Sequence, residues 1–192
     1  MAHDTATDFH SLSNHFLIAM PQLSDQFFGN SVVYVCEHTP DGAMGVIINK
    51  PSPVRMDQLF EAAEVPVPQR FAEQWVLMGG PVQIDRGFLV HSPVGSWQSS
   101  LRVNEDIAVT TSRDIIGGLS ADENSAIKTF ATIGYSGWGG GQLERELNDN
   151  HWLVIPADPH ILFDLPYYRR YDAALDTLGI RAVNLAPGAG HA

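Results

Sequence analysis

A glycine-rich segment late in the chain constrains the fold more than any other feature of the sequence. Four of the 17 glycines lie within Gly137–Gly141, directly after the β-rich run Ile127–Tyr135. Because glycine has no Cβ atom, the backbone there can adopt positive φ angles or pass close to another part of the chain. The charged amphipathic segment that follows predicts a helix over about Gly141–Asn148. The region therefore predicts a strand, a tight backbone turn and a helix.

Other apolar runs predict a sheet. Val32–Cys36 and Met44–Asn49 are joined by the turn residues Thr39-Pro40-Asp41-Gly42, which favour a hairpin. Both arms are apolar at consecutive positions, and this indicates a sheet that is covered on both faces. Further strands are predicted over His15–Met20, Trp75–Met78, Gly87–His91, Arg102–Thr110 with an interruption at Asn104-Glu105-Asp106, and Trp152–Ile155.

Three more helices are predicted from apolar spacing and end signals. One covers about Arg55–Glu64, a second runs from an N-cap at Ser112 through Leu119, and the last runs from an Asp164 cap to Gly179. The buried face of the last helix is predicted to hold Tyr168, Tyr171, Leu175 and Leu178.

Strands outnumber helices and do not alternate with them, so the sequence predicts an α+β fold with a mixed sheet and about four helices. The length of 192 residues and the 44% hydrophobic content suit one core. We expect a single domain over residues 14–192 and a flexible polar tail over residues 1–13.

Composition excludes several classes of function. The net charge of −11 opposes direct binding to nucleic acid, and Arg169-Arg170 is the only basic pair. No apolar run is long enough to cross a bilayer, so no membrane association is expected. The single cysteine, Cys36, excludes an internal disulfide, predicts a buried and unreactive thiol, and suits a cytoplasmic location.

Six separated blocks of the sequence occur in a recognisable order: Leu17–Pro21 with Ser31–Val33, Gly42–Pro51, Gly79–Val82 with Asp85–Phe88 and His91-Ser92, Gly134–Leu147, Trp152, and Ile161–Asp164. Through these blocks the chain resembles the YqgE/AlgH family of uncharacterised bacterial proteins over nearly its whole length. The resemblance implies a single α+β domain built on coiled, mixed sheets. A transcriptional-regulator label accompanies the family name, without residues assigned to DNA contact or catalysis.

The candidate catalytic patterns are incomplete. Ser136 lacks the second glycine of a nucleophile elbow, because residue 138 is tryptophan, although a triad of Ser136, His151 and Asp149 could still form in space. The glycine segment matches neither dinucleotide nor P-loop spacing, and Glu144 and Glu146 would oppose a bound phosphate. The histidines lack a metal-ligand spacing, so neither a metal nor a cofactor is expected.

Two glycine turns indicate a binding groove instead. Gly79-Gly80 and Gly137–Gly141 both follow strands, so they are predicted to meet at one end of the sheet. Asp85 and Arg86 are predicted to form a buried ion pair that holds the first turn. The predicted binding residues are Arg86, His91, Ser136, Trp138 and Gly139.

The sequence favours a non-enzymatic cytoplasmic binding or regulatory protein that recognises a protein or a small molecule through this groove. A hydrolase or transferase that uses Ser136 or a neighbouring polar residue is the first alternative. The second is a transcriptional regulator that acts indirectly, or through a local basic face around Arg169-Arg170 and Arg181.

Overall fold

The computed structural model describes residues 9–21, 23, 28–181 and 185. Its strands form one sheet with the order β10-β1-β2-β3-β9-β6-β8-β7, and β5 joins β9 while β4 pairs with β5. The strands are β1 (His15–Ala19), β2 (Val32–Thr39), β3 (Gly42–Ile47), β4 (Pro51–Arg55), β5 (Trp75–Met78), β6 (Val82–Ser92), β7 (Ser100–Arg102), β8 (Ala108–Thr110), β9 (Lys128–Gly139) and β10 (Trp152–Pro156).

Pairing between β5 and β9 is parallel, whereas the other paired strands are antiparallel. The helices are α1 (Met56–Ala62), α2 (Asp114–Ala121), α3 (Gln142–Asn148) and α4 (Tyr167–Thr177), with a 3₁₀ turn at Gln69–Phe71 and a π-helical turn at His160–Asp164. The predicted mixed α+β domain is thus confirmed.

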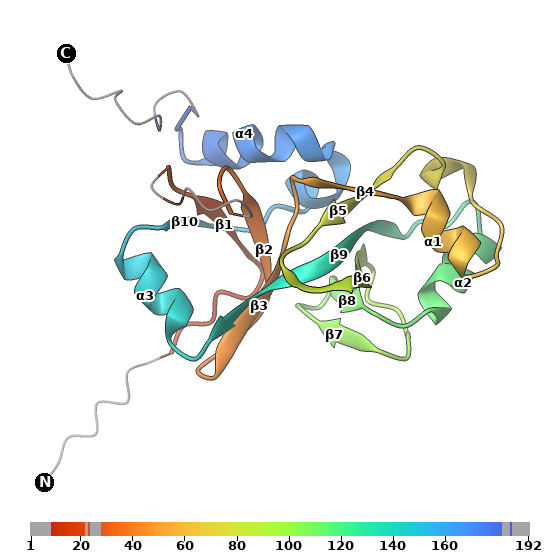
Figure 1. The fold of residues 1–192 in the computed structure, drawn as a ribbon, viewed down its shortest axis with the longest axis horizontal. Coiled ribbons are helices and arrows are strands. Elements are labelled where there is room, and N and C mark those ends of the chain that lie inside the picture. The colour runs from red at the N-terminus through yellow and green to blue at the C-terminus, as the bar shows by residue number, and fades with distance from the viewer. Residues whose placement is uncertain (1–8, 22, 24–27, 182–184, 186–192) are drawn as a thin grey trace, which may run out of the picture.

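Strand β9 organises the sheet. It crosses the middle of the molecule: its first half lies between β5 and β6, and its last residues pair with β3, beyond which lie β2, β1 and β10 (Figure 1). Its last residues, from Ser136 to Gly139, pair with β3. The predicted turn at Gly137–Gly141 is therefore wrong in its first half, because a tertiary strand partner extends β9 through Gly139. Gly141, at φ 73°, is the N-cap of α3.

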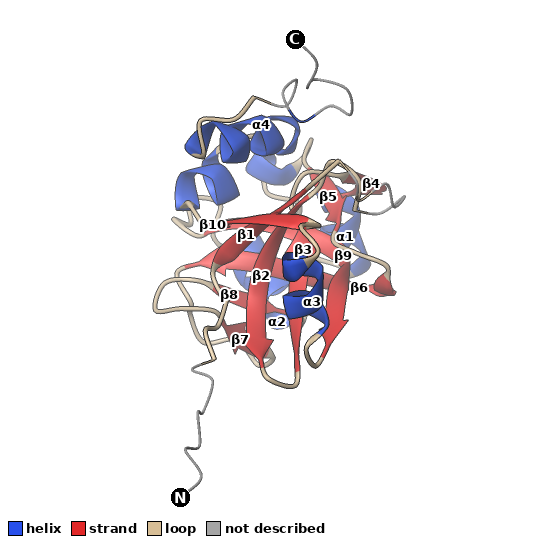
Figure 2. Ribbon diagram, turned by 90° about the vertical axis from the view of Figure 1, so that its left-hand side faces the viewer, coloured by secondary structure: helices blue, strands red, loops and turns tan. Residues whose placement is uncertain are grey.

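Both faces of the predicted hairpin are covered, as expected. Along β2, Val32, Tyr34 and Cys36 belong to one apolar cluster with the buried side of α4. Val33 and Val35 belong to another, which contains Leu143 of α3. A third cluster lies between α1, α2 and the strands β5, β6 and β9. Helix α4 lies above β10 and β1 in both views (Figures 1 and 2).

Strand β4 was not predicted, because it begins with Pro51-Ser52-Pro53. Proline cannot donate a hydrogen bond to a sheet ladder, so it is confined to edge strands and strand starts. Here β4 pairs only with β5, which leaves its other edge without a strand partner in the described residues. Its prolines thus suit an edge position.

Two helix starts differ from the prediction, and one helix end agrees with it. The N-cap of α2 is Arg113 rather than Ser112, whose hydroxyl donates to Asp114. The N-cap of α4 is Pro166, while Asp164 ends the preceding π-helical turn. Gly179 follows α4 at φ 69°, and the amides of Gly179 and Ile180 bond back to α4, as predicted for a glycine-terminated helix.

Part of the predicted N-terminal tail is attached to the sheet. The Ser11 hydroxyl donates to the His38 carbonyl oxygen, the Leu12 amide donates to His38 Nδ1, and the His38 amide donates to Ser13 Oγ, each at 3.0 Å. These bonds hold residues 11–13 against β2, which differs from the loose tail expected over residues 1–13. Residues 1–8 lie outside the described residues.

Candidate functional site

The two glycine turns of the predicted groove have different neighbours: Gly79-Gly80 packs on β9 at residues 132–136, whereas Gly140 lies against Pro40 and Asp41 of the β2–β3 turn. A Cβ atom on Gly80 would lie 2.2 Å from the carbonyl carbon of Tyr135, and one on Gly79 would lie 2.4 Å from the Gly134 carbonyl oxygen. Ser136 is fully buried in this contact and its hydroxyl donates to the Gly79 carbonyl oxygen at 3.0 Å. Backbone therefore fills the space where a ligand was expected.

His91 is buried within the sheet and holds two partners. Its Nδ1 lies 2.9 Å from the Pro93 carbonyl oxygen, and its Nε2 lies 2.7 Å from Thr110 Oγ1. The carbonyl requires a proton on Nδ1, so Nε2 accepts from the threonine hydroxyl. Burial lowers the pKa of His91, and the bond to Pro93 acts weakly in the opposite direction. Both ring nitrogens are hydrogen-bonded within the protein, so His91 has a structural role.

Of the predicted binding residues, Trp138 lines an open groove near the tip of the β2–β3 hairpin, and Gly139 is not among the residues that line it. The groove has a volume of about 620 Å³, and Trp138 lines it together with Met44, Val82 and Tyr135. The Trp138 ring is buried, and its Nε1 donates to Glu146 Oε2 at 2.5 Å, which anchors β9 to α3. Gly139 donates its amide to the side chain of Gln142 at 3.0 Å.

Arg86 and the proposed triad do not join this groove. Arg86 is exposed and its Nη2 donates to Thr111 Oγ1 at 3.3 Å, and Asp85 is also exposed, so the predicted buried ion pair is wrong. In the described residues no hydrogen bond joins Ser136 to His151, because the serine hydroxyl is directed to Gly79. The predicted residues thus lie in several separate places.

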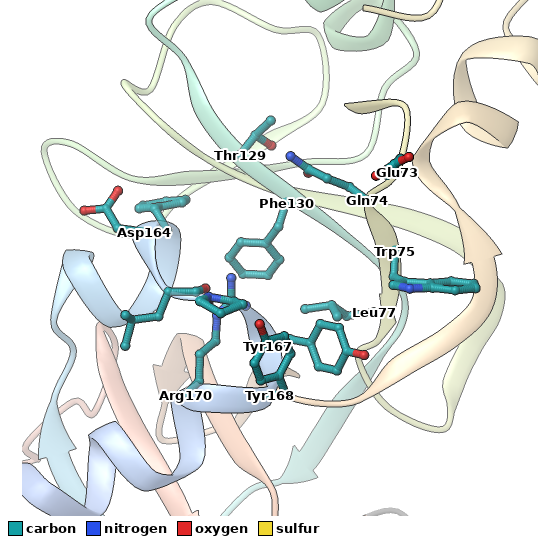
Figure 3. Close-up of a pocket in the computed structure, with 13 residues that line it drawn as sticks. Glu73, Gln74, Trp75, Leu77, Thr129, Phe130, Asp164, Tyr167, Tyr168 and Arg170 are labelled. Carbon is teal, nitrogen blue, oxygen red and sulfur yellow. The ribbon is translucent and has the colours of Figure 1, made fainter. Parts of the chain in front are cut away.

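A different cleft combines aromatic rings with a buried cation. It lies between the start of α4, the π-helical turn before it, and strands β5 and β9, and has a volume of about 520 Å³ (Figure 3). The aromatic residues that line it are Trp75, Phe130, Phe163, Tyr167 and Tyr168. Trp75 is 42% exposed and Tyr168 is 70% exposed, whereas Phe130 is buried at the floor. Large exposed rings beside a cleft are typical of a binding site.

Arg170 forms the charged part of the floor. Only 5% of this residue is exposed, and its guanidinium lies 4.9 Å from the centroid of the Phe130 ring. Its Nη1 donates to the Ile48 carbonyl oxygen at 2.7 Å and its Nε donates to the Leu165 carbonyl oxygen at 3.1 Å. Figure 3 shows the side chain rising from α4 toward the ring. The sequence placed Tyr168 in the core at this turn, and the structure places Arg170 there instead.

Among the described residues, Arg170 forms no ion pair with a carboxylate. No carboxylate of the described residues lies within 4.0 Å of the Arg170 guanidinium. Asp164 at the rim bonds Lys128 at 2.7 Å and His160 at 3.2 Å, and these partners lower its pKa. Burial lowers the pKa of Arg170 to about 10, so it remains protonated at neutral pH. The cleft therefore holds a buried positive charge that has no anionic partner in the part of the chain that the structure describes.

The described residues show neither a metal cluster nor a membrane helix. No group of three or more histidine, cysteine, aspartate or glutamate side chains among them is placed to hold a metal ion. None of their helices is long and apolar enough to cross a bilayer. Cys36 is buried, as predicted, and burial raises the pKa of its thiol.

Sequence comparisons place this fold among known proteins. A family model described as AlgH-like matches residues 16–183. The chain belongs to the AlgH-like family. This confirms the resemblance inferred from the sequence blocks. A UPF0301 protein of Neisseria meningitidis is 56% identical to the chain over 182 residues, which cover 95% of the chain and 100% of the relative. A UPF0301 protein of Chromobacterium violaceum is 51% identical over 183 residues, covering 95% and 98%.

Two solved structures share the fold of this AlgH-like chain. The solution structure of AlgH from Pseudomonas aeruginosa has a TM-score of 0.76 and 42% identity, with full coverage of both chains. A crystal structure of a Corynebacterium diphtheriae protein has a TM-score of 0.69 and 19% identity over 86% of each chain, which shows the fold alone. The family is uncharacterised, so these names assign no reaction and no ligand.

Proposed function

We propose that this AlgH-like protein is a non-enzymatic binding protein whose ligand site is the cleft between α4, β5 and β9, called here the aromatic cleft. The observation that carries the proposal is the set of rings around the buried Arg170, with Trp75 and Tyr168 exposed at the edges. Its volume of about 520 Å³ lies within the roughly 300–1,000 Å³ typical of small-molecule sites.

The polar groups near the cleft support binding rather than catalysis. A nucleophile needs a base within hydrogen-bond reach, and among the described residues neither Thr129 nor Tyr168 in the cleft is hydrogen-bonded to a histidine or a carboxylate. Ser136, the nucleophile considered from the sequence, is buried behind Gly79. A hydrolase centred on Ser136 would need the sheet to open before substrate could enter.

Direct regulation through DNA is less well supported than binding of a small molecule. The proposed basic face around Arg169-Arg170 has only one of these two charges at the surface, because Arg170 is buried. The remaining surface belongs to a chain of net charge −11, which repels phosphate backbones. The groove beside Trp138 stays a prediction as a second binding surface.

A ligand-observed NMR screen of small aromatic fragments tests the aromatic cleft. Wild-type protein should give saturation-transfer signals that a Trp75→Ala, Tyr168→Ala double variant loses. The control is Ile84→Ala, which removes a 57% exposed apolar side chain on β6, outside the residues that line the cleft. Equal signals from wild type and the double variant would contradict the proposal, and so would signals lost only in a Trp138 variant.

A further inference from the structure

Building on the proposed function, we infer that the ligand of the aromatic cleft is a small organic carboxylate with a planar apolar body, and that Arg170 receives its carboxylate group. Three observations carry the inference: the donors that Arg170 keeps free, its missing counter-charge, and the shape and charge of the surrounding walls.

Arg170 has donors to spare and is held in one orientation. A guanidinium carries five N–H donors in a rigid plane. Its bonds to the carbonyl oxygens of Ile48 and Leu165 use one donor each from Nη1 and Nε. Three N–H groups therefore remain, two on Nη2 and one on Nη1. These donors can bond the two oxygens of a carboxylate, and the fixed orientation of the guanidinium lowers the ordering cost of binding.

The burial of Arg170 favours an anionic ligand over a neutral one. Neutral carbonyl groups satisfy part of its hydrogen-bonding capacity but do not compensate its charge. A buried charge is normally paired, and no carboxylate of the described residues lies within 4.0 Å to fulfil that role. A ligand carboxylate would supply the absent partner at a site already screened from water.

The residues around Arg170 favour a ligand with a single negative charge. Glu73 and Asp164 are both exposed and lie on opposite sides of the cleft (Figure 3), so acidic groups border the entrance to Arg170. Lys128 and His160 already contact Asp164, and Arg170 is the only cation among the lining residues. One guanidinium balances one carboxylate, whereas a phosphate dianion or a nucleic acid would carry additional charge toward an acidic rim.

The walls favour a planar apolar body. The Phe130 ring lies under the guanidinium, and the rings of Tyr167 and Tyr168 meet edge to face with centroids 5.5 Å apart. Together with Leu77 they give the cleft apolar surfaces on which an aromatic or heteroaromatic ring can pack. The carboxylate would then reach the floor while the ring stays between the side walls.

Matched ligand pairs on the wild-type protein test this inference. Phenylacetate and indole-3-acetate differ from phenylacetamide and indole-3-acetamide by charge at nearly equal size. Titrations to about 10 mM, followed by protein-observed NMR, detect a Kd in the millimolar range. We expect each acid to bind at least about tenfold more tightly than its amide, with the shift changes centred on the cleft.

The outcomes separate this inference from the proposed function. Acids and amides that bind the cleft equally well would overturn the carboxylate assignment and leave the aromatic cleft as a binding site. Absence of binding there by every one of these compounds would overturn both.

Variants at Arg170 give an independent readout. Arg170→Gln should reduce the affinity for the acid to about the affinity for the amide. Arg169→Gln changes an exposed neighbour on the same helix and should leave the affinity for the acid unchanged. Arg170→Lys keeps the charge but removes the planar fork, and should retain only part of the preference. If Arg170→Gln does not fold, as judged by circular dichroism, the comparison of acid with amide on the wild type still decides the question.

Discussion

Replacing Arg170 by methionine is expected to destabilise the protein by about 1–4 kcal/mol, whereas the same change at Arg169 should alter stability by no more than about 0.5 kcal/mol. The two arginines are adjacent on α4, but Arg170 is buried and Arg169 is exposed. The pair therefore compares one chemical change in two environments on a single helix.

The magnitude follows from the contacts of the guanidinium. Loss of two charged hydrogen bonds, to Ile48 and Leu165, costs about 3–6 kcal/mol in total. Loss of the contact with Phe130 costs about 1 kcal/mol more. Returning the cation to water offsets about 3 kcal/mol, because burial lowers its pKa to about 10 and each pKa unit corresponds to ~1.36 kcal/mol. The free energy of unfolding of the Arg170→Met variant is therefore lower than that of the wild type by about 1–4 kcal/mol.

Urea unfolding followed by circular dichroism measures this difference, provided that the denaturant slope m is unchanged between the variants. Equal stability of the two methionine variants would refute the reasoning. A more stable Arg170→Met protein would refute it too, since it would mean that desolvation of the cation outweighs its hydrogen bonds.

Three further predictions concern the fold, its pH dependence and DNA. Gly80→Ala should cost at least about 2 kcal/mol in urea unfolding, because its Cβ would lie 2.2 Å from the Tyr135 backbone, while Gly87→Ala, where no atom lies within 4 Å of the added Cβ, serves as the tolerated control. The pKa of His91 is lower in the folded protein than in the unfolded chain, so the unfolded chain binds a proton at this histidine first as the pH falls. The contribution of His91 to the free energy of unfolding is therefore complete above the unfolded pKa of about 6.5 and is lost progressively as the pH falls below that value. The thermal midpoint should accordingly fall less steeply on acidification in His91→Asn than in wild type, and parallel curves would contradict this. Fluorescence anisotropy with labelled duplex DNA should show no salt-dependent binding at low ionic strength, because the chain carries a net charge of −11; binding that weakens with salt would show a local basic surface.

Local signals in the sequence predicted much of the sheet. The Thr39–Gly42 turn and its two apolar arms correctly located the hairpin β2–β3, and consecutive apolar residues correctly indicated two covered faces. The glycine at the end of α4 was also informative, since position 179 does adopt a positive φ. These features depend on neighbouring residues, which is why sequence patterns reveal them.

Features that depend on tertiary partners were missed. The glycines after Tyr135 gave no sign that β9 would continue, because the strand extends only when β3 lies beside it. Proline at positions 51 and 53 argued against a strand, and only the edge position of β4 makes them acceptable. In both cases the deciding interaction joins segments far apart in the sequence.

The aromatic cleft was missed for a related reason. Apolar periodicity assigned Tyr168 to the core and treated Arg170 as a surface cation, yet Tyr168 is 70% exposed and Arg170 is 5% exposed. The carbonyl oxygens that accept from Arg170 belong to residues 48 and 165, and no local pattern links the first of these to α4. Tyr171 and Leu175 face the core as predicted, whereas Leu178, also predicted on the buried face, is 41% exposed.

The chain's four tryptophans offer the most direct measurement of binding in the aromatic cleft. Trp75 lines the cleft, whereas Trp97 contacts Gly118 of α2 and Trp138 and Trp152 belong to the cluster around α3. In a ¹H–¹⁵N spectrum of the wild-type protein, titration with indole-3-acetate should shift the indole N–H signal of Trp75 and leave the other three in place. A shift of the Trp138 signal with an unchanged Trp75 signal would contradict the proposed site.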